Sequence, residues 1–232
     1  MKKFLILSLL AFLLVGTSSC KHSKPDIPPD FGFVALANAP GPINVDNIIS
    51  TDREYMFLHY GGDYRWYETD ILLTNYLDAD AQDGSVASVT DIFQNIEEVS
   101  PGCADSYVIY ACHPADGNAY LKAEQGFWIE DFPLNNEAIK VSYSDAYNKV
   151  MASNYVKPHS RHCVLRSPIG PLLANPQYIF GNVKAQLYVD AVTGEVLNHN
   201  PAFPPDLVIA VPSGFPASPA AATVPSGSPA GK

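Results

Sequence analysis

Short segments rich in aromatic and β-branched residues, each bounded by Gly, Pro, Asn or Asp, follow one another through most of the chain. This pattern is typical of antiparallel strands joined by tight turns. A clear helical pattern occurs at 145–153, where Ala146 and Val150 share one side and Ser142 or Ser144 supplies a cap. The sequence therefore predicts an α+β fold, an antiparallel sheet with one or two short helices. Strands are expected at 107–111, 127–129, 162–167, 177–181 and 185–190.

Two segments of the first half are harder to assign. Residues 55–60 (YMFLHY) and 64–77 are rich in β-formers and flank Gly61-Gly62-Asp63, which predicts a hairpin over 55–77. Residues 86–99 are ambiguous, because their apolar residues also fall at helical spacing and a Ser or Thr precedes them as a possible cap.

The N-terminus has the pattern of a secretory signal. Two lysines precede an apolar run, Phe4–Val15, which is too short to span a hydrocarbon core of about 30 Å as a helix. Small residues follow it directly. Residues 1–19 are therefore predicted to be a signal peptide, which directs the chain to the cell envelope.

Gly16-Thr17-Ser18-Ser19 followed by Cys20 resembles the lipobox of a bacterial lipoprotein. The resemblance implies that Cys20 becomes the first mature residue and carries acyl chains, palmitate among them, that anchor the protein in a membrane. Lys21 stands where an Asp would retain a lipoprotein at the inner membrane, which favours the outer membrane. Residues 20–30 would then be a lipidated tether. Ordinary signal cleavage near Ser18 or Ser19 is the alternative.

The C-terminal stretch 211–232 consists mainly of Pro, Ala, Ser and Gly, and VPSGFPA recurs as VPSGSPA. Such a segment buries too little apolar surface to offset the entropy of ordering it. We expect a disordered tail there, and a folded body over about 31–210.

The body is acidic in its first half and basic in its second. The net charge of −10 excludes a nucleic-acid partner, because phosphate binding needs a cationic surface. Residues 66–121 contain ten Asp or Glu and no Lys or Arg, whereas 138–184 contain six basic residues and Asp145 alone. This asymmetry predicts a division into an acidic β-rich half, 31–137, and a second half, 138–210. The two halves could attract each other, or the acidic face could meet a cationic partner.

Within the second half, YVDAVTGEV at 188–196 resembles the closing strand of a PepSY domain. Its Asp and Thr-Gly suit a tight turn, with Gly at a positive φ. The resemblance covers about 138–198 and implies a helix followed by an antiparallel meander. It also implies a non-catalytic module of secreted proteins, with suggested roles in regulating proteases, and it transfers no catalytic residues.

Three cysteines remain if Cys20 is lipidated: Cys103, Cys112 and Cys163. Cysteines tend to pair in an oxidising compartment. A Cys103–Cys112 bridge is disfavoured if 106–112 is extended, because the Cα atoms of a disulfide lie within about 7 Å. We expect a disulfide from Cys163 to either Cys112 or Cys103, which would staple the two halves.

Metal and catalytic patterns are weak. The spacing of zinc ligands is not matched by Cys112-His113 together with His159-x-x-His162-Cys163. The acidic loop 78–84 lacks the bidentate glutamate of a calcium-binding loop. No metal or cofactor is therefore predicted. No established catalytic motif occurs. The carboxylates of Glu124, Glu130 and Asp131 near Trp128 leave a glycosidase pair as an alternative.

These observations favour a lipid-anchored envelope protein that binds or regulates a protein or polymer partner without catalysis. Two alternatives stay open. The first is an envelope hydrolase that acts on carbohydrate, and the second is a surface structural or adhesion component, which the tail alone suggests.

Overall fold

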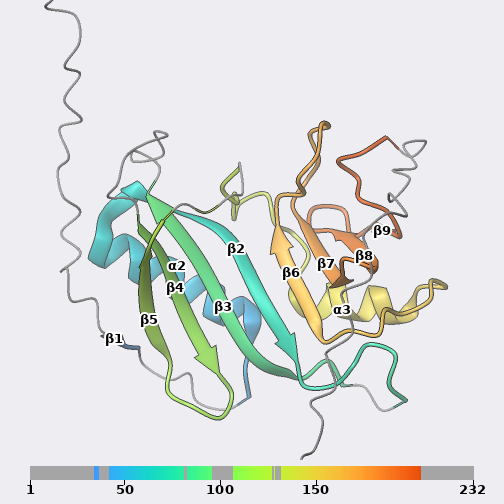
Figure 1. Ribbon diagram of the computed structural model, residues 1–232, viewed down its shortest axis with the longest axis horizontal. Helices are drawn as coiled ribbons and strands as arrows, with labels where there is room; N and C mark the ends of the chain where they lie inside the picture. The colour runs from blue at the N-terminus through green and yellow to red at the C-terminus, as the bar shows by residue number, and fades with distance from the viewer. Residues whose placement is uncertain are drawn as a thin grey trace, which may run out of the picture.

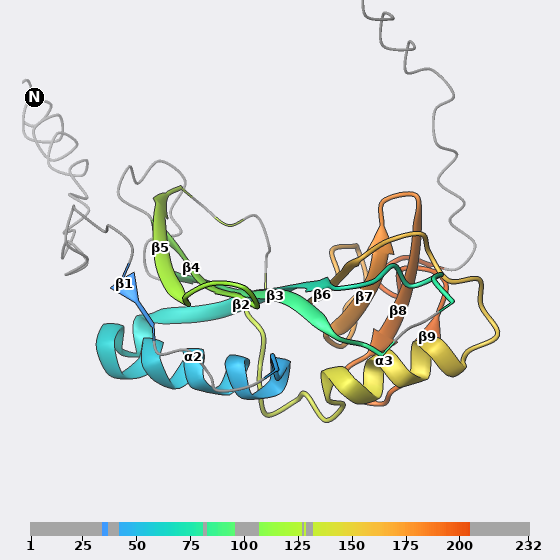
Figure 2. The ribbon, with the colours of Figure 1, turned by 90° about the horizontal axis from the view of Figure 1, so that it is seen from below.

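The computed structural model describes residues 34–36, 42–80, 83–95, 107–126, 128 and 132–204. Over these residues the chain forms one antiparallel sheet with two helices, both on the same side of it (Figures 1 and 2). The predicted α+β class with an antiparallel sheet is confirmed. The helices are α2 (Val45–Tyr60) and α3 (Tyr143–Ala152), and a 3₁₀ turn, η1 (Gly61–Asp63), follows α2.

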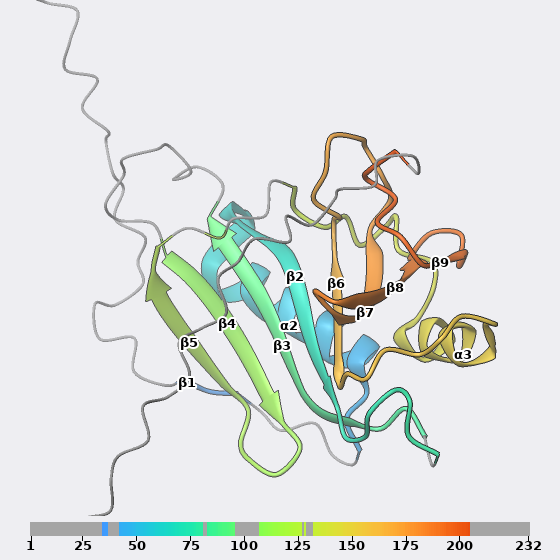
Figure 3. The ribbon, with the colours of Figure 1, turned by 45° about the vertical axis from the view of Figure 1, so that its right-hand side comes forward.

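The sheet has nine strands among the described residues, in the order β1-β5-β4-β3-β2-β6-β7-β8-β9 (Figure 3). Every neighbouring pair is antiparallel. The strands are β1 (Val34–Ala35), β2 (Tyr64–Leu73), β3 (Val86–Asn95), β4 (Tyr107–Pro114), β5 (Tyr120–Gln125), β6 (His162–Arg166), β7 (Gln177–Asn182), β8 (Ala185–Asp190) and β9 (Val196–Leu197).

The same arrangement occurs twice along the chain. Helix α2 is followed by the four-stranded meander β2–β5, and helix α3 is followed by the four-stranded meander β6–β9. The first strands of the two meanders pair with each other, from Glu68 opposite Arg166 to Leu72 opposite His162. Because that central pair is antiparallel and both helices cover one face, an approximate two-fold axis perpendicular to the sheet relates the two units (Figure 2).

The hairpin expected over 55–77 is wrong in its first arm, because residues 55–60 are the last turns of α2. The helix begins at Val45 and is capped by Asn44, whose side chain accepts a hydrogen bond from Asn47 N at 3.0 Å. Its buried residues recur at helical spacing, with Ile48, Asp52 and Met56 on the face toward the sheet. The β-forming composition of 55–60 is therefore overridden by a cap and a pattern that lie upstream of it.

The helical spacing in 86–99 does not produce a helix, because 86–95 form strand β3; residues 96–99 lie outside the described residues. Strand β3 lies between β2 and β4 and is buried on both faces. Val89 and Phe93 belong to the core beneath the helices, whereas Ile92 lies on the other face. Burial of both faces removed the alternation that would have marked a strand. The strand expected over 127–129 is absent at Trp128, and its two neighbours lie outside the described residues.

The second unit follows the sequence closely. Ser142 caps α3, since its Oγ accepts a hydrogen bond from Asp145 N at 3.0 Å. Strands β6, β7 and β8 lie at the expected segments. After β8 the chain turns on Asp190, whose Oδ1 accepts hydrogen bonds from Val192 N and Thr193 N at 2.8 and 2.9 Å. Gly194 has φ +76°, as its place in the turn predicts.

A single hydrophobic core extends beneath both units, between the sheet and the helices. It includes Met56 and Phe93 of the first unit and Val150, Leu165 and Phe180 of the second. The division expected at 137/138 lies between β5 and α3, so it separates the two helix-and-meander units. Neither of the described helices is long and apolar enough to cross a membrane.

Candidate binding site at the edge of strand β8

Strand β8 is only partly covered on its outer side. All six of its residues pair with β7, whereas only Tyr188 and Val189 pair with β9. Strand β9 ends at Leu197, and the chain then leaves the sheet. The stretch 185–187 therefore has β7 on one side and no described strand on the other.

The backbone N–H and C=O groups of successive strand residues point alternately to the two sides of the strand, and this decides which of them face the open edge. Asp190 N donates to Glu195 O at 2.9 Å, so the backbone of Asp190 points toward the β9 side. Residues two and four positions away along an antiparallel strand point the same way. Tyr188 therefore faces β9, and Gln186 presents its N–H and C=O at the point where β9 has already ended.

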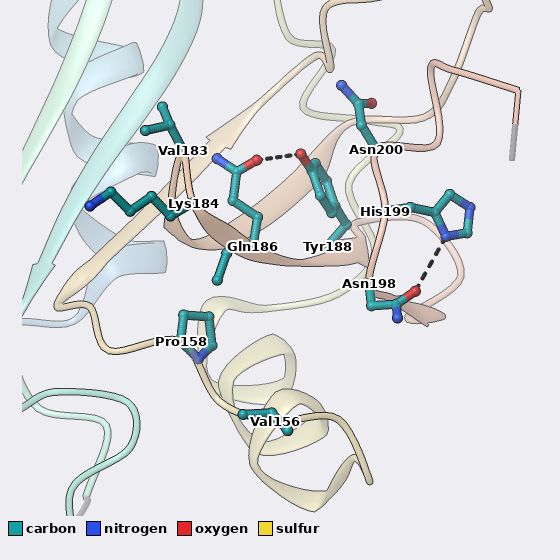
Figure 4. A pocket seen from close by; sticks show the side chains of 10 residues that line it. Val156, Pro158, Val183, Lys184, Gln186, Tyr188, Asn198, His199 and Asn200 are labelled. Atoms are coloured by element: carbon teal, nitrogen blue, oxygen red, sulfur yellow. Dashed lines mark hydrogen bonds between the residues drawn. The ribbon is translucent and has the colours of Figure 1, made fainter. Parts of the chain in front are cut away.

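A surface hollow of about 330 Å³ lies at this point (Figure 4). Its walls come from three parts of the second unit: the segment after α3, the β7–β8 hairpin and the segment after β9. The β7–β8 hairpin tip and the segment after α3 each contribute an exposed valine, with 96% and 92% exposure respectively. The lining residues are Val156, Pro158, Val183, Lys184, Ala185, Gln186, Tyr188, Asn198, His199 and Asn200.

Hydrogen bonds hold the polar walls in place. Tyr188 Oη donates to Gln186 Oε1, as Figure 4 shows. Asn200 Nδ2 donates to Ile169 O at 3.0 Å, and its Oδ1 accepts from Ala202 N at 2.9 Å. The bond between Tyr188 and Gln186 orders the wall formed by β8, and the two bonds of Asn200 order the wall formed by the segment after β9.

The electrostatic character of the hollow differs from that of the chain. None of its lining residues is acidic, although the whole chain carries a net charge of −10. Lys184 and His199 are the basic residues among those that line it, and Gln186, Asn198 and Asn200 supply amides; in Figure 4 the amine of Lys184 points away from Gln186. Such a lining favours a ligand that offers hydrogen-bond acceptors and negative charge.

The turn between β8 and β9 positions this edge. Partial burial raises the pKa of Asp190, but hydrogen bonds from Thr193 N, the Asn175 side chain and Val192 N together outweigh it and lower the pKa. The carboxylate therefore stays charged and anchors the turn. Near the end of the turn, a Cβ added at Gly194 would lie 2.7 Å from Lys149 Cε of α3, so the turn packs directly against the helix.

We find no match to the chain among protein-family models, curated proteins or solved structures.

The structure does not form the bridge between Cys163 and Cys112, and both are free thiols. Cys112 lies on β4 and Cys163 on β6, with β3 and β2 between them, which separates them by about 14 Å at the usual strand spacing. They also lie on opposite faces of the sheet, because Cys163 belongs to the core and Cys112 is opposite Thr90 on the other face. Burial raises the pKa of both thiols. Cys20 and Cys103 lie outside the described residues.

The histidines considered as metal ligands are held apart. His162 and Cys163 point to opposite sides of β6, as adjacent strand residues do. His159 Nδ1 lies 3.0 Å from the Asp78 carboxylate, and its ring stacks on Tyr76 with centroids 4.3 Å apart. This contact joins the acidic loop of the first unit to the basic segment of the second. Among the described residues, no three His, Cys, Asp or Glu side chains gather as a metal site.

The carboxylates considered for a glycosidase pair are only partly visible. Glu124 lies on β5 and forms an ion pair with Lys122 of the same strand. The Trp128 ring stands edge-on to Tyr110, with centroids 6.2 Å apart, and Trp128 N donates to Gln94 Oε1 at 2.9 Å. Glu130 and Asp131 lie outside the described residues.

A buried polar group between α2 and the sheet was not anticipated. His113 Nε2 contacts both carboxylate oxygens of Asp52, and Thr69 Oγ1 hydrogen-bonds to Asp91 Oδ1. Trp66 Nε1 donates to Thr69 Oγ1 at 3.0 Å. These side chains are 0–8% exposed, so they hold the helix to the sheet and present little surface to a ligand.

The hollow also escaped sequence reasoning. Gln186 and Tyr188 alternate with Leu187 and Val189 of the core, and Tyr188 is buried as well, at 6% exposure. Their meeting with Asn198 and His199 depends on where β9 stops. Asn198, Asn200 and Pro201 follow the strand and are consistent with its end, but they do not indicate which strand edge is left open.

Proposed function

We propose that this is a lipid-anchored protein of the cell envelope that binds a partner protein through its second unit and performs no catalysis itself. The observation that carries the proposal is the acid-free hollow at the partly unpaired edge of β8. Exposed backbone at a sheet edge, ordered amides and a cationic side chain are the features of a binding surface.

The PepSY-like sequence of about 138–198 supports the same function. Helix α3 followed by the meander β6–β9 agrees with the arrangement that the resemblance implies. The turn at Asp190 and Gly194, which carries the resemblance, lies next to the hollow on the same strand. The proposal therefore places the binding site for the partner on this unit, which would act as a regulatory module.

The location of the protein is proposed from the sequence. Cys20 would carry the acyl chains, residues 20–30 would form the tether, and Lys21 favours the outer membrane. An anchored protein meets its partner within the reach of its tether, which raises the effective concentration of a weakly binding surface.

Site-specific photo-crosslinking tests the proposal. We would place a photoreactive amino acid at Val183 on the hollow, and at Phe57 on the outer side of α2 as the control; both positions are exposed, at 96% and 67%. In cells that produce the protein natively, the Val183 position should give one discrete adduct in the envelope fraction that the Phe57 position does not give. Failure to form an adduct, or the same adducts from both positions, would contradict binding at this site.

A further inference from the structure

We propose that the hollow receives an extended, acidic peptide segment of the partner, which adds to the sheet beside Gln186 of strand β8. This inference rests on the proposed function and names the chemistry of the partner at the same site.

The backbone supplies the first argument. Gln186 faces the outer edge at a position where β9 provides no opposite residue. A strand edge with unpaired N–H and C=O groups is a template for another extended chain. The hollow lies along that edge, because Ala185 and Gln186 form one of its walls. An incoming segment would continue the position of β9 past Leu197.

The side walls supply the second argument. The side chains of an added strand alternate between the two faces of the sheet. On one face they would meet Gln186 and the small exposed part of Tyr188, which is 6% exposed, and on the other Val156 and Pro158 (Figure 4). Val183 at the hairpin tip is almost fully exposed and would be covered by the same segment. A peptide with alternating polar and apolar residues fits these two walls.

The charge supplies the third argument. Lys184 and His199 line a hollow without acidic residues, on a chain whose net charge is −10. An acidic segment is repelled by the acidic first half of this protein and attracted by the basic second half, which gives both orientation and selectivity. The exposed side chain of Lys184 points away from Gln186 in Figure 4 and would turn toward a carboxylate bound in the hollow.

Binding of random heptapeptides to the purified full chain tests the inference. Selected peptides should be enriched in Asp and Glu, and Lys184→Gln should weaken them about three- to fivefold at low salt, as expected for an exposed ion pair. Lys122→Gln makes the same charge change on β5 and should leave the affinity unchanged. Selection without acidic enrichment, or equal binding to both variants, would overturn the proposed charge pairing.

Strand addition is tested on the peptide, so that the protein stays intact. Methylating single backbone nitrogens of a selected peptide removes one N–H at a time, and at least one central position should lose about tenfold in affinity. Gln186→Pro, which removes the edge donor, should weaken the same peptide. If no methylated position matters, the ligand does not pair with β8 and the inference fails.

Two further outcomes would also overturn it. An oligosaccharide of glucuronic acid that binds as tightly as the peptides would show that the site selects the charge alone. A chain lacking 211–232 that binds the peptides tenfold more tightly would show that its own tail occupies the hollow. If crosslinking from Val183 captures a partner while the peptide results fail, only this inference falls; if crosslinking captures nothing, the proposed function falls.

Discussion

His113 Nε2 on β4 lies 2.9 and 2.8 Å from the two carboxylate oxygens of Asp52 on α2, and the two residues are 8% and 2% exposed. Removing one member leaves the other buried without its partner. We expect His113→Ala to lower the free energy of unfolding by about 3–5 kcal/mol. Urea unfolding measures this, with the exposed His199→Ala as the control, which should change it by less than about 0.5 kcal/mol. A cost below about 1 kcal/mol for His113→Ala would show that the pair contributes little.

The buried carboxyl group of Asp91 should make the free energy of unfolding depend on pH. Burial, and next the nearby Asp52 charge, raise the pKa of Asp91 well above its usual value. The folded chain therefore holds this proton more tightly than the unfolded chain does. The resulting stability is complete below the unfolded pKa of about 3.9 and is lost as the pH rises through the folded pKa.

Asp91→Asn keeps a neutral side chain of the same shape at every pH. Relative to wild type, this variant should therefore become more stable as the pH rises from 4 to 8, by at most about 1.4 kcal/mol per pH unit. Urea unfolding at several pH values gives the difference. A difference that stays constant over this range would show that Asp91 does not titrate between the two states.

Gly194 closes the turn between β8 and β9 at φ +76°. We expect Gly194→Ala to destabilise the chain by about 1–3 kcal/mol, because an L-residue is strained at this φ and its Cβ would crowd Lys149. Gly62→Ala is the matched control, since no atom lies within 4 Å of its added Cβ and its φ is not in the positive region. Thermal unfolding of both variants measures the contrast, and equal melting temperatures would refute the proposed strain.

An ion pair lies where strand β2 of the first unit pairs with strand β6 of the second, a boundary that we call the seam. Arg166 Nη1 on β6 lies 3.6 Å from Glu68 Oε2 on β2, and these residues are opposite each other in the register. A double-mutant cycle with Glu68→Gln and Arg166→Gln should give a coupling of about 0.5–1 kcal/mol, which decreases in 1 M salt. A coupling indistinguishable from zero at low salt would show that the seam depends on strand pairing alone.

The anchor has a direct test in fractionated cells. Cys20→Ala should release the protein into the soluble periplasmic fraction or the medium, because it removes the atom that would carry the acyl chains. Cys163→Ala is a matched cysteine control that lies in the core, and it should not detach the protein from membranes. A Cys20→Ala protein that still pellets with membranes would count against lipidation.

Local signals in the sequence were sufficient for the second unit. The Ser142 cap, the spacing of Ala146 and Val150, and the Asp-x-x-Thr-Gly turn after β8 all act within a few residues, and each occurs where it was predicted. The first unit was harder, because its segments carry conflicting local preferences. Residues 55–60 have β-forming composition within a helix, and β3 has helical spacing within a strand.

The sequence by itself determined the class of the fold, the helix and meander of the second unit, and the charge difference between the two halves, because these follow from composition and short-range patterns. Only the tertiary structure decided that the first half repeats the same arrangement and that β2 pairs with β6. It also decided that Cys112 and Cys163 lie on opposite faces of the sheet, and that β9 pairs with Tyr188 and Val189 but ends before it reaches the position opposite Gln186. Each of these depends on which distant strand lies alongside and which face it buries, and that free energy belongs to the assembled sheet rather than to any segment of it.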